Sequence, residues 1–234
     1  MKKLILLTAI SFIWLTALLP LNVSAADITV GATTWYSWWD FDQSGNTNNT
    51  EFDSALLYGP ALSVKFNEDY NMTFVFLYGN FDMNETDSGT GTETTRELTR
   101  TDSDLALNYR LSSYFKIFAG AKYMSYKMPD FDHSSIGPGA GISFVVPVGG
   151  DFFILGNISG LYLWGRDDQN DEKDNYKEYG ANSSLSIAYY IASASTTISL
   201  GGRYQYFKTD YPDNNDITHQ FYGATLSANY SFSI

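Results

Sequence analysis

The last fourteen residues, Phe221 to Ile234, alternate strictly between two kinds of side chain. The odd-numbered positions, which we call the second parity, hold small polar residues from Gly223 through Ser233. The first parity is apolar or aromatic and consists of Tyr222, Ala224, Leu226, Ala228, Tyr230, Phe232 and Ile234. A period of two is the pattern of a β-strand with two unlike faces. A strand of this length with one apolar face is typical of a barrel that closes in lipid.

The start of the chain has the pattern of an export signal. Two lysines precede an uncharged apolar segment, Leu4 to Leu19, which Pro20 ends and small residues follow. The segment has about 16 residues, whereas a membrane-spanning helix needs about 20. We therefore predict a secretory signal peptide over residues 1–25 and a single β-barrel domain over residues 26–234. The chain has no cysteine, which excludes a disulfide framework.

Ten segments of alternating polarity occur in the chain, each about 10 to 15 residues long. Strands of soluble proteins usually have about 5–6 residues, whereas a tilted strand needs about 9–11 to cross a bilayer. The lengths therefore favour membrane-spanning strands. The ten segments are Ile28–Trp39, Ser54–Phe66, Asn71–Phe81, Asp102–Leu111, Phe115–Met128, Gly137–Val148, Phe152–Arg166, Glu178–Ile191, Thr196–Lys208 and Gln220–Ile234.

The connections between these segments alternate between short and long. Short periplasmic turns and long outer loops are the known asymmetry of membrane barrels. We predict an all-β fold, a transmembrane antiparallel up-and-down barrel of ten strands with both ends on the periplasmic side. Eight strands is the alternative, if predicted neighbours prove to be one strand. The long connections are 40–53, 82–101, 129–136, 167–177 and 209–219.

The export signal, the ten amphipathic segments and the closing strand together resemble small bacterial outer-membrane β-barrel proteins. The resemblance implies a location in the bacterial outer membrane, in contact with lipid and lipopolysaccharide. It also implies insertion by the barrel assembly machinery, which recognises the closing strand. That strand ends here in Ile234, where the family usually has Phe. The net charge of -12 argues against nucleic acid as a partner.

Aromatic residues gather near the predicted strand ends. Aromatic rings favour the interface between lipid and water, so we predict two girdles around the barrel. The predicted girdle residues are Trp35, Trp38, Trp39 and Trp164 beside the long loops, and Tyr230 and Phe232 near the short turns.

The polar parity predicts a hydrated lumen that carries five cations and one carboxylate, a net charge of +4. Lys122 and Arg203 fall near mid-strand and need partners or water. Either they pair with Asp104 and plug the interior, or they bias a narrow passage towards anions. The predicted lumen charges are Lys65, Asp104, Arg110, Lys116, Lys122 and Arg203.

The first long loop has the oxygen spacing of a calcium loop. Gly45 would permit the sharp turn that such a loop needs. Thr47 departs from the usual apolar residue, and the flanking segments are predicted strands, so an ordinary polar surface loop is the alternative. Ca²⁺ is the one cofactor that we predict. Its candidate ligands are Asp40, Asp42, Ser44, Asn46, Asn48 and Glu51.

Three functions remain open from the sequence. The first is a narrow, porin-like channel for small solutes. The second is a non-conducting surface scaffold, whose acidic loops bind divalent cations, lipopolysaccharide or a surface partner. The third is an outer-membrane hydrolase using His133 or His219, with Asp132 and Ser134 beside His133. No nucleophile motif accompanies these residues, so we expect a protein that is not an enzyme.

Overall fold

The structure is a computed structural model that describes residues 27–43, 49–86, 89–169, 172–210 and 216–234. The predicted signal peptide over residues 1–25 lies outside these described residues. No helix within them has the length and apolar character needed to cross a membrane.

In the described part of the chain, eleven β-strands and one short 3-10 helix are present. The strands are β1 (Asp27–Gln43), β2 (Asn49–Phe52), β3 (Ala55–Lys65), β4 (Tyr70–Thr86), β5 (Glu93–Arg110), β6 (Phe115–Met128), β7 (Phe131–Gly149), β8 (Phe152–Gln169), β9 (Glu172–Ile191), β10 (Thr196–Asp210) and β11 (Ile217–Ser233). The helix η1 (Ala192–Ala194) connects β9 to β10.

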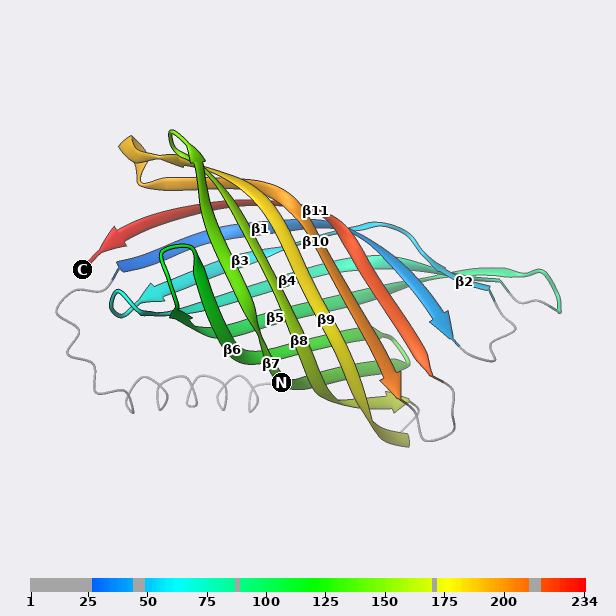
Figure 1. Cartoon of the computed structure of the whole chain (residues 1–234). Helices are drawn as coiled ribbons and strands as arrows, with labels where there is room; N and C mark the ends of the chain where they lie inside the picture. The colour runs from blue at the N-terminus through cyan, green and yellow to red at the C-terminus, as the bar shows by residue number, and fades with distance from the viewer. Residues whose placement is uncertain (1–26, 44–48, 87–88, 170–171, 211–215) are drawn as a thin grey trace.

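Ten of the described strands close into one antiparallel barrel, in the order β1-β11-β10-β9-β8-β7-β6-β5-β4-β3 (Figure 1). The ladder between β1 and β11 runs without interruption from Asp27↔Ser233 to Gln43↔Ile217. β1 also pairs with β3, the last strand in this order, and this pairing closes the ring. A closed ladder pairs the backbone groups of each strand, which is a requirement in lipid. The predicted ten-stranded up-and-down barrel is confirmed, and the eight-stranded alternative is excluded.

The outer surface of the barrel is apolar on every barrel strand. Leu200 is 63 % exposed, and Leu185 and Ile187 are each 58 % exposed. In water such a continuous apolar band would be strongly unfavourable, whereas in a bilayer it faces acyl chains. The even-numbered parity of β11 faces this surface, as the alternation predicts, with Leu226 and Tyr230 each 50 % exposed. The chain is therefore a transmembrane barrel.

The predicted long connections are largely strands, and here the sequence prediction is wrong. β6 ends at Met128 and β7 begins at Phe131, so the predicted loop 129–136 is only a two-residue turn. β4 and β5 likewise continue to Thr86 and from Glu93. Polar side chains occur on both faces of these extensions. The sequence therefore has no apolar parity there that would indicate a strand. Their backbones are held by the same ladder as the membrane part.

The hairpin of β4 and β5 extends beyond the ends of the other strands, with the short strand β2 beside it (Figure 1). β2 pairs with β4 from Asn49↔Thr86 to Phe52↔Met83. We call this part the projecting sheet: β2, residues 80–86 of β4 and residues 93–99 of β5. It lies on the side of the barrel opposite the start of β1 and the end of β11. In a membrane barrel this is the extracellular side.

The opposite rim has four short turns, and their side chains stabilise them. Asn67 Oδ1 accepts hydrogen bonds from the backbone N–H groups of Asp69 (2.8 Å) and Tyr70 (2.9 Å). In the next turn, Ser112 Oγ accepts hydrogen bonds from the backbone N–H groups of Tyr114 and Phe115. Ser195, after η1, has a positive φ of 48°. Short turns of this kind hold adjacent strands in register.

The sidedness of the barrel can be tested with single cysteines, because the sequence has none of its own. We expect Thr94→Cys in the projecting sheet to react with a membrane-impermeant maleimide on intact cells. Ser113→Cys, in a periplasmic turn, should react only after the outer membrane is opened. Thr94 and Ser113 are both exposed, so the two cysteines would differ only in the side of the membrane on which they lie. If only Ser113→Cys were labelled on intact cells, the barrel would have the opposite orientation in the membrane.

Candidate functional site

Every barrel strand contributes at least one inward-facing side chain that is almost fully buried. These side chains are at most 1 % exposed. Several are direct ladder partners, such as Trp35↔Leu57 and Leu163↔Glu178, so they form a continuous belt inside the barrel. We call this belt the plug. Its members are Trp35, Leu57, Leu77, Arg100, Met124, Ser135, Leu163, Glu178, Gln205 and Phe221.

Arg100 crosses the lumen and holds the plug together. It lies on β5, and β10 is five strands away in either direction around the closed ten-strand order, so the two strands face each other. Arg100 Nη2 donates a hydrogen bond to Gln205 Oε1 on β10 at 2.7 Å. Its guanidinium carbon lies 3.4 Å from the ring centroid of Phe221 and 5.4 Å from that of Trp35. These cation–π contacts hold the guanidinium against two aromatic side chains of the plug.

An ion-pair network lies directly below Arg100, on its periplasmic side. The carboxylate of Asp102 accepts hydrogen bonds from Arg100 Nη2 at 3.0 Å and from Arg203 Nη2 at 3.3 Å. Lys122 donates to Asp102 and also to Asp104, at 3.1 Å for the latter. Arg203 Nη2 reaches Asp104 at 2.8 Å. Since Arg203 is on β10 and both aspartates are on β5, this network too joins opposite walls.

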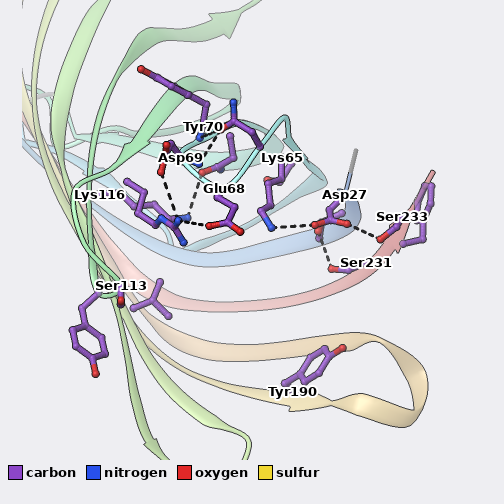
Figure 2. Close-up of a pocket in the computed structure, with 18 of the residues that line it drawn as sticks. Asp27, Lys65, Glu68, Asp69, Tyr70, Ser113, Lys116, Tyr190, Ser231 and Ser233 are labelled. Atoms are coloured by element: carbon purple, nitrogen blue, oxygen red, sulfur yellow. Dashed lines mark hydrogen bonds and ion pairs between the residues drawn. The ribbon is translucent and has the colours of Figure 1, made fainter. Parts of the chain in front are cut away.

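The remaining predicted lumen charges, Lys65, Arg110 and Lys116, line the periplasmic mouth, where Figure 2 shows Lys65 and Lys116. Lys65 pairs with Asp27 at 3.2 Å. Arg110 pairs with Glu68 at 2.9 Å. Lys116 donates to Asn71 Oδ1 at 3.3 Å and forms no ion pair with any described carboxylate.

The predicted girdle is wrong for two tryptophans. Trp35 and Trp39 are 0 % and 5 % exposed, and both point into the barrel. They share the odd parity of β1, whose even parity faces lipid, so they cannot lie at the interface with the other girdle residues. Trp39 instead stacks on Phe52 with ring centroids 3.8 Å apart. The outward-facing girdle residues are Trp38, Trp164, Tyr230 and Phe232.

Both histidines lie inside the barrel, and only 3 % of His133 and 7 % of His219 is exposed. They belong to strands β7 and β11, although both were predicted at loops. His133 Nδ1 is 2.9 Å from Asp167 Oδ1, and its Nε2 is 3.3 Å from Glu178 Oε1. Trp39 Nε1 donates to His219 Nδ1 at 3.3 Å. These partners hold both imidazoles in the interior of the barrel.

The candidate calcium ligands are divided between strands. Asp40 and Asp42 are exposed residues of the regular ladder of β1, and Glu51 is exposed on β2. Ser44, Asn46 and Asn48 lie outside the described residues. Within the described ranges, no three His, Cys, Asp or Glu side chains are grouped as a metal site. The calcium loop stays a prediction.

Arg100 is not among the residues predicted from the sequence, and Asp102 has no predicted role in the lumen. Arg100 fell within the predicted loop 82–101, and Asp102 stood at its border. A signal for both was present, because Arg100, Asp102 and Asp104 take alternate positions and therefore share one face of a strand. Extending the inward parity of β5 by two residues would have found the centre of the network.

Comparison with known proteins finds similarity in structure only. No family model matches the chain, and no curated protein matches its sequence. Neisserial surface protein A is 10 % identical over 89 % of this chain and 99 % of its own, with a TM-score of 0.42. OprG from Pseudomonas aeruginosa is 12 % identical over 89 % and 95 %, with a TM-score of 0.40. AlkL, solved in lipid bilayers, is 12 % identical over 88 % and 90 %, with a TM-score of 0.43. The fold assignment rests on the strand pairing and the apolar exterior described above.

Removing the shared anion should destabilise the barrel strongly. We expect Asp102→Asn to lower the free energy of unfolding by about 3–5 kcal/mol, because it leaves buried cations uncompensated. The control is Asp132→Asn, which breaks the exposed pair with Lys127 at 3.0 Å and should cost less than about 1 kcal/mol. Urea unfolding in lipid vesicles, followed by tryptophan fluorescence, measures both. Equal losses would contradict a central role for Asp102.

Proposed function

We propose that this protein is a non-conducting barrel of the bacterial outer membrane that works as a surface-binding scaffold. The observation that carries this proposal is the plug, to which all ten barrel strands contribute a side chain at most 1 % exposed. A water-filled passage would wet the inner face of at least one strand at this level. Among the described residues, no strand has an exposed inner face there.

The chemistry of the plug also argues against a channel that opens easily. An ion would have to displace Arg100 from Asp102, Gln205 and the ring of Phe221. Breaking a buried ion pair leaves a desolvated charge, which costs about 3–5 kcal/mol for each pair. The two histidines are enclosed on the outer side of the same interior, so the geometry gives no support to a hydrolase.

The projecting sheet is the element best suited to bind a partner. Residues 93–98 of β5 pair only with β4, because the ladder to β6 begins at Thr99↔Lys127. Among the described strands, β2 also pairs with β4 alone. The projecting sheet therefore has two edges, whose backbone groups can accept another extended segment.

The charge of the projecting sheet defines the chemistry of that segment. Five acidic residues and one exposed basic residue give it a net charge of -4. A basic extended segment of a partner protein would complement this charge. The charged residues are Glu51, Asp82, Glu85, Glu93, Glu97 and Arg96.

Planar-bilayer recordings test the closed lumen. We expect no channel steps with the wild type, and discrete steps with the triple variant Trp35→Ala/Arg100→Ala/Phe221→Ala, because three large side chains then leave the plug. The conducting variant demonstrates that the assay detects insertion. A matched variant in the projecting sheet, Thr94→Ala/Arg96→Ala/Glu97→Ala, should stay silent. Steady currents through the wild type would overturn the proposal in favour of the channel.

Synthetic peptides test the binding edge. We expect a ten-residue peptide of alternating lysine and threonine to bind and to slow hydrogen exchange in residues 93–98. Its counterpart with glutamate for lysine should bind at least about tenfold more weakly because of like charge. A version with proline at alternate positions should not bind, because proline cannot donate to a ladder. Protection that is equal for all three peptides would exclude strand addition at this edge.

A further inference from the structure

The periplasmic half of the barrel is hollow below the plug. An inner cavity of about 420 Å³ lies directly under Asp104, Lys122 and Arg203. It shares Asn71 and Lys116 with a wider mouth of about 610 Å³ at the short turns (Figure 2). The inner cavity therefore opens towards the periplasm and is closed at its other end. Its volume falls in the range of small-molecule sites, about 300–1,000 Å³.

The wall of the inner cavity is rich in hydroxyl and amide groups. Its lining includes Thr33, Thr73, Ser143, Ser186, Ser227 and Asn157, which come from six different strands. Asn157 Nδ2 donates to Ser184 Oγ at 2.6 Å, whereas its Oδ1 has no hydrogen-bond partner. The serine and threonine hydroxyls of the wall can both donate to and accept from the hydroxyl groups of a ligand. Phe118, Val75, Val145 and Leu161 add apolar surface between these polar groups.

The cavity also has an excess of positive charge. Lys116, Lys122 and Arg203 line it together with a single carboxylate, Asp104, so the lining carries three minus one, or +2. Arg100 and Asp102 lie behind the lining and cancel each other. The ends of the cavity are both cationic, because Lys116 stands at the mouth and Arg203 at the closed end. An uncompensated charge of this kind in a narrow lumen favours an anion as ligand.

Lys116 is the cation most available to such an anion. Its ammonium group has three donors, and it uses one of them on Asn71 Oδ1. Lys65 and Arg110, in contrast, are engaged by carboxylates at the mouth. Arg203 uses Nε on Asn182 and Nη2 on the two aspartates. Lys116 therefore has donors free for an incoming ligand, beside the path into the cavity.

We propose that the inner cavity binds a small, hydroxylated anion from the periplasm, of the class of acidic monosaccharides. The anionic group, a carboxylate or a phosphate, would be held by Lys116. The ligand's hydroxyl groups would bond to the serine, threonine and asparagine side chains of the wall. This site is separated from the projecting sheet by the plug, so it does not depend on the surface function proposed above.

Calorimetric titration of the detergent-solubilised barrel tests this site with three probes: glucuronate, glucose 1-phosphate and glucose. We expect both acids to bind and glucose to bind at least about tenfold more weakly, because it lacks the charge-assisted hydrogen bond. Tighter binding of one acid identifies the anionic group. Affinity should fall as salt is raised, since the attraction is electrostatic.

Variants locate the site. Lys116→Gln should weaken glucuronate binding about tenfold, the effect of one charge-assisted hydrogen bond. Ser186→Ala should weaken it by a smaller factor, about threefold, as for a neutral hydrogen bond. Lys127→Gln is the control, because it removes an exposed cation near the opposite rim, and it should change nothing. The proposal is overturned if neither acid binds the wild type at millimolar concentration, or if Lys116→Gln binds both acids as the wild type does.

Discussion

The interior of this barrel depends on polar side chains that reach from β5 across to β10. Arg203 meets Asp102 and Asp104 on the opposite wall, and Arg100 meets Gln205 in the other direction. Charges in so narrow a lumen are far from bulk water, and each one needs a partner at close range. Because the two connections run in opposite directions, they fix the spacing of the walls as well as neutralising charge. The aromatic side chains of the plug pack on this frame.

The same network divides the barrel into two unlike halves. On the extracellular side the lumen is filled by aromatic rings and by His133 with its partners Asp167 and Glu178, and β4 and β5 continue into the projecting sheet. On the periplasmic side, serine, threonine and asparagine line open space. The barrel therefore presents two separate surfaces to two compartments. The buried side chains of the plug lie between these two surfaces.

Much of this architecture could be predicted from alternation, and the failures have clear causes. The segment Phe115–Met128 coincides with β6, because a clean apolar parity and two turns mark it. Both parities of β1 are aromatic near its outer end, so alternation could not tell inward-facing Trp35 and Trp39 from lipid-facing Trp38. Arg100 was hidden because its neighbours on the outward face of β5, Thr99 and Thr101, are polar and show no apolar parity. The contact of His133 with Glu178 depends on strand register, which no local pattern contains.

The ladder between β1 and β11 has a kinetic consequence. It joins the two barrel strands that are farthest apart in the sequence. A side-chain hydrogen bond between these strands, formed by Thr29 Oγ1 and Ser231 Oγ, links positions 202 residues apart. Hairpins can form from neighbouring segments, but the circle is complete only when these two strands meet. Until then β1 and β11 each have an unpaired edge, and the apolar faces of ten strands have no lipid to contact. Closure is thus a late, high-contact-order event, and the half-built sheet is the species most exposed to aggregation.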